Sequence, residues 1–405
     1  MNLCGHTEQS HEGPPPYGRE SCPVRLSDFL RGFQKSVAVP KSLTPLFARS
    51  NLIVMTTKSL IVPDLPSYEG AGPFTSYTAA VVQAAPVFLD LEASIDKADT
   101  LIAEAAGQGA SLVVFPELWL PGYPWWIWLD GPAWAMRNGY DLRYREQALV
   151  YGSPQALRLA ESARRHRVTV IMGLVEREAG TLYIAQWAIG PDGKTLGTRR
   201  KLKPGAIERA TFGEGGATDL QVWSTTAGKL GALCCAEHRH PLFRYALQQQ
   251  GEQVHVAAWP SFSVYQPFAT GVSASTNLTL SRSYAAEAGC YVLAACSVLP
   301  EATCAALCDT DAKRQWLAPG GGHSQIFGPD GSPLCEPLGE HTEGLLYATI
   351  THDRILAAKG AYDGIGHSHR PDVVGLWRPD TCLSPSAPAA GHHMLSGAAG
   401  DQEPT

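Results

Sequence analysis

Features that would indicate a large charged or membrane partner are missing from this sequence. It has no basic run, and its net charge is −6, so it offers phosphate backbones and anionic lipids no electrostatic footprint. No stretch approaches the roughly 18 uninterrupted apolar residues of a membrane-spanning helix, and the start lacks the basic-then-apolar pattern of a secretion signal. We therefore expect a soluble, cytoplasmic protein that binds neither nucleic acid nor a membrane.

Cysteine is also scarce: ten residues in a chain of 405 are too few for a disulfide scaffold. No two of them form a C-x-x-C pair, so neither structural zinc nor dithiol redox chemistry is expected. Most of these thiols should be buried and unreactive. The question is whether one of them differs from the rest.

What is present is enough for a large core, since 44% of the residues are hydrophobic and 17% are charged. Residues 1–76 are rich in Pro, Gly and Ser, with one short helical pattern at 26–33, and predict a poorly ordered extension. Met55 within it is an alternative candidate for the initiating residue. Residues 379–405 predict a flexible tail, which leaves one regular domain at 77–378.

Within that domain, short apolar runs alternate with helical periods. The runs at 168–176 and 181–189 predict a hairpin, and a turn is predicted at 191–193, after the second strand. Such alternation favours an α/β layered domain with sheets covered by helices. The other predicted strands are 78–83, 111–115, 230–234, 254–258, 291–295, 324–327 and 344–350, and the predicted helices are 91–106, 153–165, 242–250 and 275–288.

Three segments place a reactive side chain at the end of an apolar strand, where α/β folds carry their chemistry. In the first, Glu117 follows the apolar run from Leu112 and precedes an aromatic loop. Apolar surroundings would raise its pKa toward that of a working general base. Alone, it could equally cap a helix or pair with a surface arginine.

The second segment runs from Arg199 through Lys201 to Pro204 and leads to Glu208. A charge cluster of this kind is usually a solvated basic turn. In the third, the strand from Leu230 runs into Cys235 and turns abruptly into charged residues. That is typical of a nucleophile elbow, where helix amides and a nearby cation favour the thiolate.

Two adjacent cysteines in a strand are more often small core residues, and position makes Cys234 the buried one. The combination is stronger than its parts, because Glu117, Lys201 and Cys235 together supply a base, a cation and a nucleophile. His238 and His240 follow; as a pair alone they favour solvent-facing side chains over metal ligands.

These segments resemble the nitrilase superfamily, from about Tyr77 to Val374. The resemblance also rests on stretches at 123–130, 200–204, 208–215 and 252–261, and on downstream motifs at 320–322, 326–331, 343–347 and 366–372, which are similar to true nitrilases. It implies a four-layer α-β-β-α sandwich of two sheets flanked by helices, a catalytic Glu117, Lys201 and Cys235, and a supporting Glu208. It implies a nitrile substrate, no metal or other cofactor, and a homodimer or larger helical homo-oligomer.

The resemblance also implies a mechanism and a pocket. Glu117 would activate Cys235, a thioimidate and a thioester would form, and Lys201 with the Ala236 backbone N–H would stabilise the anionic intermediates. The loop aromatics could instead form a subunit contact. The pocket-lining residues that we predict are Trp125, Trp126, Trp128, Trp134, Trp259 and Pro260.

Two positions depart from the family pattern: Ala236 replaces the usual Trp after the nucleophile, and Gly205 replaces a common Thr. Losing the indole, with roughly 200 Å² of contact surface, should enlarge or reshape the pocket. Two alternatives stay open. One is an amide or carbamoyl hydrolase with the same triad, and the other is a catalytically silent homologue that acts through assembly.

Overall fold

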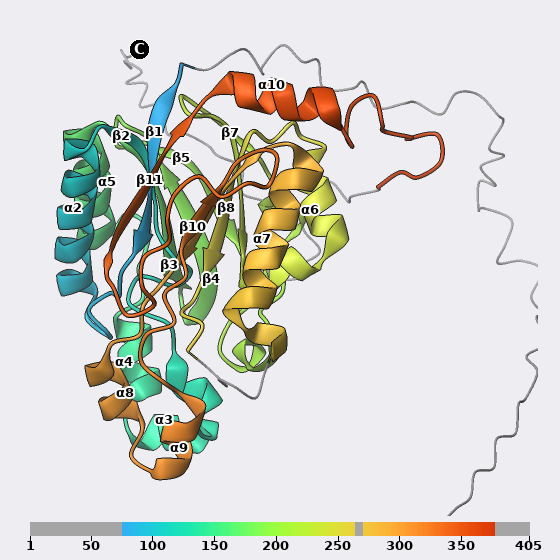
Figure 1. Ribbon diagram of the computed structural model, residues 1–405. Helices are drawn as coiled ribbons and strands as arrows, with labels where there is room; N and C mark the ends of the chain where they lie inside the picture. The colour runs from blue at the N-terminus through green and yellow to red at the C-terminus, as the bar shows by residue number, and fades with distance from the viewer. Residues whose placement is uncertain (1–74, 264–269, 377–405) are drawn as a thin grey trace, which may run out of the picture. The chain divides into compact units, whose positions relative to one another are not determined.

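The computed structural model describes residues 75–263 and 270–376, so the predicted extension and tail lie almost wholly outside the described residues. Two sheets stand face to face (Figure 1). The first has the order β11-β1-β2-β3-β4-β5, formed by β11 (Gly344–Ile350), β1 (Tyr77–Gln83), β2 (Ala110–Val114), β3 (Thr169–Glu178), β4 (Thr181–Ile189) and β5 (Thr195–Arg200). The second has the order β10-β9-β8-β7-β6, formed by β10 (Gln325–Phe327), β9 (Tyr291–Cys296), β8 (Val254–Trp259), β7 (Gly228–Cys234) and β6 (Trp223–Thr225).

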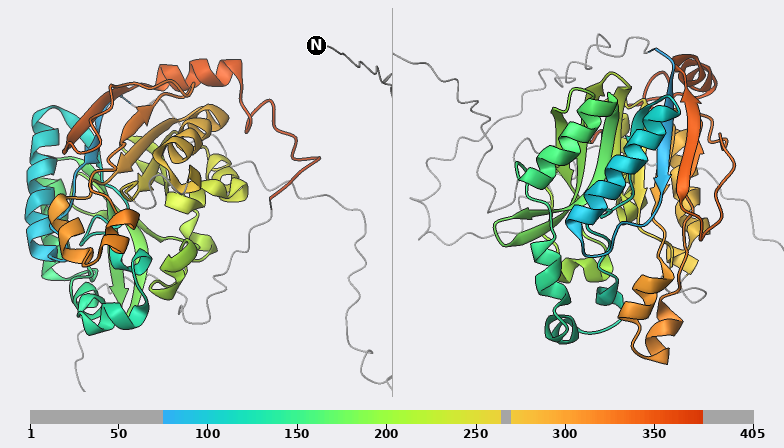
Figure 2. Two further views of the ribbon diagram at one scale, coloured as in Figure 1. Left: turned by 60° about the horizontal axis from the view of Figure 1, so that its bottom comes forward. Right: turned by 90° about the vertical axis from the view of Figure 1, so that its left-hand side faces the viewer.

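The layers follow from the alternation of side chains along each strand. In β1, Ala80 and Val82 point to the core beneath α2 (Leu91–Gly107) and α5 (Pro154–His166), while Val81 points to the core between the sheets. Figure 2 shows α2 and α5 side by side on the outer face of the first sheet. The inter-sheet core is completed by apolar residues of the second sheet such as Leu230 and Val254.

The outer face of the second sheet is covered by α6 (Pro241–Gln248) and α7 (Ala274–Ala288). The four-layer α-β-β-α arrangement is thus confirmed, as are the predicted hairpin of β3 and β4 and the helices and strands predicted within 77–378; the helical pattern at 26–33 lies outside the described residues. Sequence patterning missed several shorter elements. These are β5, β6, α3 (Pro132–Arg137), α4 (Tyr140–Glu146), α8 (Glu301–Leu307), α9 (Asp311–Trp316) and α10 (His352–Ala361).

The two-sheet arrangement brings together chain segments that leave β2, β5, β7 and β8. One glycine makes this possible: a Cβ at Gly173 of β3 would lie 1.9 Å from the Pro116 carbonyl oxygen, so only glycine lets the chain after β2 cross here. The backbone N–H of Glu117 then reaches the Trp259 carbonyl at the end of β8, at 3.3 Å. The crossing ties the first sheet to the second beside the candidate site.

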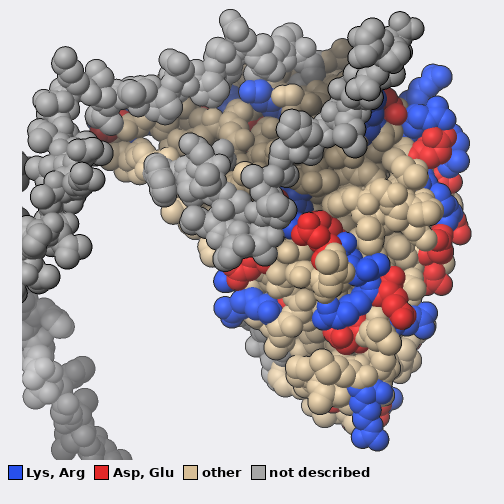
Figure 3. Space-filling view, turned by 180° about the vertical axis from the view of Figure 1, so that it is seen from behind, with Lys and Arg blue, Asp and Glu red and all other residues tan. Residues whose placement is uncertain are grey.

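Two further observations concern the charges on the surface and the apolar character of the helices. On the face in Figure 3, acidic and basic side chains are interspersed and form no stripe of one sign. Among the described helices, none combines the length and apolar character needed to cross a membrane.

Candidate active site

Two of the three side chains expected to act together, Glu117 and Lys201, meet in a buried cluster with the expected supporting residue Glu208. Lys201 directly follows β5, and its Nζ donates hydrogen bonds to Glu117 Oε1 at 2.7 Å and to Glu208 Oε2 at 2.8 Å. The side chains of Lys201 and Glu117 are fully buried, and that of Glu208 is 4% exposed. We call Glu117, Lys201 and Glu208 the charged cluster.

The charged cluster holds two carboxyl groups and one ammonium, and their mutual effects shift the pKa values of Glu117 and Lys201. Burial, the strongest influence, raises the pKa of Glu117 to about 8; Lys201 opposes this shift and Glu208 adds to it. Burial works against the charge of Lys201, but the two carboxylates hold its pKa well above the usual value. Glu117 Oε2 is buried and has no hydrogen-bond partner among the described residues. This oxygen is free to take a proton.

Cys235 sits at a sharp turn between β7 and the 3₁₀ helix Cys235–Arg239, with φ of 42°. A non-glycine residue in the left-handed region is uncommon and marks a nucleophile elbow when a reactive side chain occupies it. Burial raises the pKa of the Cys235 thiol well above its usual range; Glu117 raises it further, while Lys201 and the Ala236 backbone N–H lower it. The thiol therefore needs a base to ionise it. Cys234 is fully buried, as predicted.

A buried ion pair that the sequence did not reveal joins the nucleophile elbow to β5. Arg199 donates to Glu237 Oε1 at 2.7 Å, and both side chains are fully buried. The same carboxylate accepts the backbone N–H of Leu202, next to Lys201, and that of Cys234, next to Cys235, each at 2.8 Å. Glu237 thus fixes the cation and the nucleophile relative to each other. Its place two residues after the candidate nucleophile was the only available signal.

A solvated basic turn is the wrong interpretation of 199–204 for two of its residues, Arg199 and Lys201. The strand period of two sends Arg199 and Lys201, each 1% exposed, into the protein. Arg200 points the other way, where its guanidinium binds Glu176 and stacks 3.7 Å from the Tyr183 ring centroid. Charge density alone could not show this, because it ignores which face each residue occupies.

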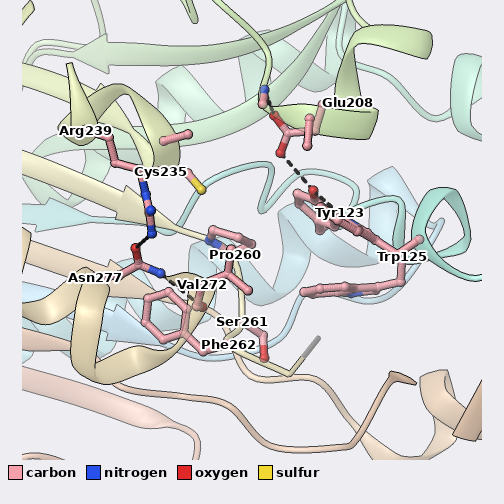
Figure 4. A pocket seen from close by; sticks show the side chains of 14 residues that line it. Tyr123, Trp125, Glu208, Cys235, Arg239, Pro260, Ser261, Phe262, Val272 and Asn277 are labelled. Atoms are coloured by element: carbon pink, nitrogen blue, oxygen red, sulfur yellow. Dashed lines mark hydrogen bonds between the residues drawn. The ribbon is translucent and has the colours of Figure 1, made fainter. Parts of the chain in front are cut away.

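A cavity of about 130 Å³ opens over Cys235. Figure 4 shows the Cys235 sulfur facing this space. On one side of it the Tyr123 hydroxyl donates a hydrogen bond to Glu208, and on the other side Arg239 donates one to Asn277. The cavity combines an apolar lining with a few polar groups, as small-molecule sites do. It is lined by Tyr123, Trp125, Trp128, Gly205, Ala206, Glu208, Cys235, Ala236, Arg239, Pro260, Ser261, Phe262, Val272 and Asn277.

The structure divides the predicted pocket residues. Trp125, Trp128 and Pro260 line the cavity, whereas Trp126, Trp134 and Trp259 do not. Trp126 and Trp134 stack on either side of the Tyr140 ring. Trp259 is fully buried, and its indole N–H donates a hydrogen bond to the Ser281 hydroxyl. The correction follows from packing, which sequence cannot show: only some indoles of the loop reach past their neighbours to the cavity.

The two departures from the family pattern are neighbours in space. A Cβ at Gly205 would lie 3.5 Å from the Ala236 Cβ and 3.4 Å from Glu208 Oε2. Gly205 also donates its backbone N–H to Glu208 at 2.6 Å. Two small residues therefore leave space at one place in the pocket wall, beside the supporting carboxylate.

The expectation of solvent-facing histidines holds for His240, which is exposed, and is wrong for His238, which is fully buried. His238 lies on the inward face of the short 3₁₀ helix, where it stacks on Trp259. In the described parts of the chain, no group of three or more His, Cys, Asp or Glu side chains is arranged to hold a metal ion.

Comparison with known proteins shows which family the chain belongs to. The family model for carbon–nitrogen hydrolases matches residues 78–359. The chain belongs to that family. A nitrilase from Pseudomonas syringae pv. syringae (strain B728a) is 52% identical over 307 residues, covering 75% of this chain and 91% of the relative. An aliphatic nitrilase from Rhodococcus rhodochrous is 42% identical over 301 residues, covering 74% and 82%. These relatives place the carbon–nitrogen hydrolase in the nitrilase branch.

Solved structures support the fold alone. A Saccharomyces cerevisiae protein of branch 10 of the nitrilase superfamily is 19% identical, with a TM-score of 0.57 over 73% of this chain and 97% of its own. An amidase of the same superfamily from Nesterenkonia AN1 is 22% identical, with a TM-score of 0.51 over 70% and 94%. Both share the two-sheet sandwich.

Proposed function

We propose that this carbon–nitrogen hydrolase is a nitrilase, which converts an organic nitrile and two water molecules to a carboxylic acid and ammonia. The observation that carries the proposal is the charged cluster, whose member Glu208 lines the same largely apolar cavity as Cys235. Relatives named nitrilase, aliphatic nitrilase and arylacetone-specific nitrilase, at 42–52% identity, support the choice of a nitrile.

The first half of the proposed reaction forms a covalent adduct. Glu117 takes the proton of Cys235, the thiolate sulfur bonds to the nitrile carbon, and Glu117 passes the same proton to the nitrile nitrogen to give a thioimidate. The free Oε2 of Glu117 suits this transfer, since Oε1 is held by Lys201. Lys201 and the Ala236 backbone N–H stabilise negative charge as it develops.

The second half uses water twice. The first water adds to the thioimidate carbon, and the C–N bond breaks to release ammonia and leave a thioester. A second water, activated by Glu117, attacks the thioester, and the C–S bond breaks to release the acid and return the proton to Cys235. If the C–S bond of the first tetrahedral intermediate breaks instead, the product is an amide.

Two further expectations, the oligomeric state and the cellular location, do not depend on the contacts of the site. The assembly is expected to be a homodimer or a larger helical homo-oligomer, and the location is expected to be cytoplasmic. Both rest on the sequence resemblance and composition, and sedimentation analysis with cell fractionation would test them.

The deciding experiment measures acid, amide and ammonia from aliphatic, aromatic and arylacetonitriles, with the matching amides as alternative substrates. Acid and ammonia from nitriles, abolished in Cys235→Ala but retained in Cys234→Ala, support the proposal. Cys234 is the matched control because it is the adjacent thiol, fully buried, and does not line the cavity. Turnover of amides alone indicates the amidase alternative, and turnover of neither indicates a silent homologue.

A further inference from the structure

A second buried polar network lies behind the nucleophile, between the second sheet and α7. His238 Nδ1 is 2.9 Å from the Cys235 carbonyl oxygen, and its Nε2 is 3.0 Å from Nε2 of His255. His255 Nδ1 is 2.7 Å from Glu252 Oε1, and the Tyr284 hydroxyl donates to the other oxygen of Glu252. We call His238, His255, Glu252 and Tyr284 the histidine chain; none is more than 2% exposed.

The direction of each hydrogen bond in the histidine chain follows from its first acceptor. A carbonyl oxygen only accepts, so His238 Nδ1 carries a proton, and in the neutral ring its Nε2 must accept. His255 Nε2 therefore donates, and with this ring also neutral, as its lowered pKa favours, its Nδ1 is bare and must accept. That leaves Glu252 Oε1 as the donor to His255 Nδ1, so Glu252 carries the proton of a neutral carboxylic acid.

The surroundings of the histidine chain agree with this neutral arrangement. Burial, the largest influence, raises the pKa of Glu252 to about 8, against weaker lowering by Tyr284 and the Gly231 backbone. Burial likewise lowers the pKa of His238 and His255 well below the usual value. The charged groups that act on the two rings oppose one another: Glu237 favours a proton on each ring, Arg244 disfavours one on either, and Arg199 disfavours one on His255.

The fold also makes room for the histidine chain. A Cβ at Gly231 of β7 would lie 1.9 Å from Glu252 Oε1, so the carboxyl group occupies space that only glycine leaves. None of the four side chains has an orphaned buried polar atom, in contrast to Glu117. A fully satisfied buried network of this kind rigidifies what it contacts.

We propose that His238 is a positioning residue for the nucleophile. Locked as its Nδ1–H tautomer by the rest of the histidine chain, it holds the Cys235 carbonyl and with it the left-handed backbone that aims the thiol. The inference rests on the proposed role of Cys235 as nucleophile, and it assigns a task to a buried group that the reaction steps do not use.

Two amide substitutions separate positioning from packing. In His238→Asn the amide N–H stands where Nδ1 stands and can still reach the Cys235 carbonyl, whereas in His238→Gln it stands where Nε2 stands. We expect His238→Gln to lower kcat by about 100-fold, the scale of a misplaced reacting group, with KM within about threefold. His238→Asn should keep kcat within about tenfold. Equal losses in both variants, or no loss in either, would overturn the proposal.

The far end of the histidine chain provides an independent test. Gln at position 252 donates to His255 and accepts from Tyr284 as a protonated Glu does, and Leu does neither. Glu252→Gln should therefore keep kcat within about threefold, and Glu252→Leu should approach His238→Gln. Impairment of Glu252→Gln as severe as that of Glu252→Leu would contradict the proton assignment.

The unmodified protein can be tested directly by solid-state NMR with ¹⁵N-labelled histidine. The proposal expects His238 as the Nδ1–H tautomer and His255 as the Nε2–H tautomer, the first assigned from the resonance lost in His238→Asn. An imidazolium at position 255, or the opposite tautomer at 238, overturns the proposal without any variant having to fold.

A second measurement, the alkylation of Cys235, separates failure of the positioning role from failure of the proposed nitrilase function. The rate at which iodoacetamide alkylates Cys235 reports the aim of the thiol whatever the substrate is. If the wild-type chain is alkylated readily but hydrolyses no nitrile, the nitrilase proposal fails, and the alkylation rates of the 238 variants still decide the positioning role. Thermal unfolding of each variant shows whether an altered rate reflects lost folding.

Discussion

The charged cluster and the histidine chain are both buried and both act on Cys235, the first through its charges and the second through a hydrogen bond, yet they are built on opposite rules. The charged cluster has two carboxylates for one ammonium and leaves Glu117 Oε2 without a hydrogen-bond partner in the part of the chain that the structure describes. In the histidine chain every side-chain polar atom has a partner. An unsatisfied buried acceptor is costly and reactive, whereas a satisfied network is stable and inert. The protein thus supplies the proposed nucleophile with an incompletely paired charged cluster and with a fully paired neutral network.

The largest expected effect comes from removing the proposed base of the charged cluster. Glu117→Gln keeps the shape of the carboxyl group but removes the base, so kcat/KM for a nitrile should fall by about 10²–10⁴-fold. The melting temperature should not fall, because the substitution removes a carboxylate whose burial is costly. Steady-state kinetics and calorimetry check both points, and a variant that keeps full activity would exclude Glu117 as the base.

Breaking the ion pair between β5 and the nucleophile elbow should cost stability as well as activity. Glu237→Gln leaves the Arg199 guanidinium buried without a counter-charge, a loss of about 3–5 kcal/mol in the free energy of unfolding. The control is Glu178→Gln, in a pair with Arg200 where Glu178 is 60% exposed, which should cost less than about 1 kcal/mol. Urea unfolding distinguishes them, and equal losses would contradict the structural role of Glu237.

The charged cluster also predicts a pH dependence. Because the pKa of Glu117 is raised to about 8, more of the carboxyl group is ionised as pH increases, and kcat/KM should rise toward that value. Glu208→Gln removes a negative charge that raises this pKa, so the acid limb of the profile should move to lower pH. The variant's maximal rate should fall, since Glu208 also holds Lys201. An acid limb that stays in place would argue against coupling between the carboxylates.

The smallest effect concerns the pocket wall at Gly205 and Ala236. Ala236→Trp should fill much of the cavity of about 130 Å³ and lower kcat/KM for arylacetonitriles several-fold relative to small aliphatic nitriles. A substrate panel with both variants measures the ratio. Ala236→Ser, which adds little volume, is the control, and an unchanged ratio in the Trp variant would show that substrates do not approach this wall.

Much of the fold could be predicted because it depends on local periodicity. The buried strands and long helices carry strong two-residue or helical patterns, and they were found within a few residues of their ends. The elements that were missed are short, such as α3, α4 and β6, or carry mixed polar residues, such as β5. Their stability comes from the tertiary contacts of loops, which no local pattern encodes.

The candidate site shows the same division. Glu117 and Cys235 could be picked out because each follows an apolar strand and differs chemically from the run before it. Lys201 follows β5, which the pattern did not reveal, and it was picked out because a cation completes the set with a base and a nucleophile. Arg199, Glu237 and His238 could not be picked out, because a charged residue is mostly exposed unless it is paired, and their partners are distant in the sequence or on other elements. The loop tryptophans could not be divided between cavity and core for the same reason.

The sequence by itself therefore determined the alternation of strands and helices that makes an α/β layered domain, since this depends on periodicity, and it singled out Glu117, Lys201 and Cys235 as candidates by their chemistry and the family resemblance. Only the tertiary structure decided which charges are buried, which indoles face the cavity, and that a neutral histidine chain supports the elbow. Burial and pairing are properties of two or more segments brought together, and the free energy of a buried polar group depends on the partner that it meets there.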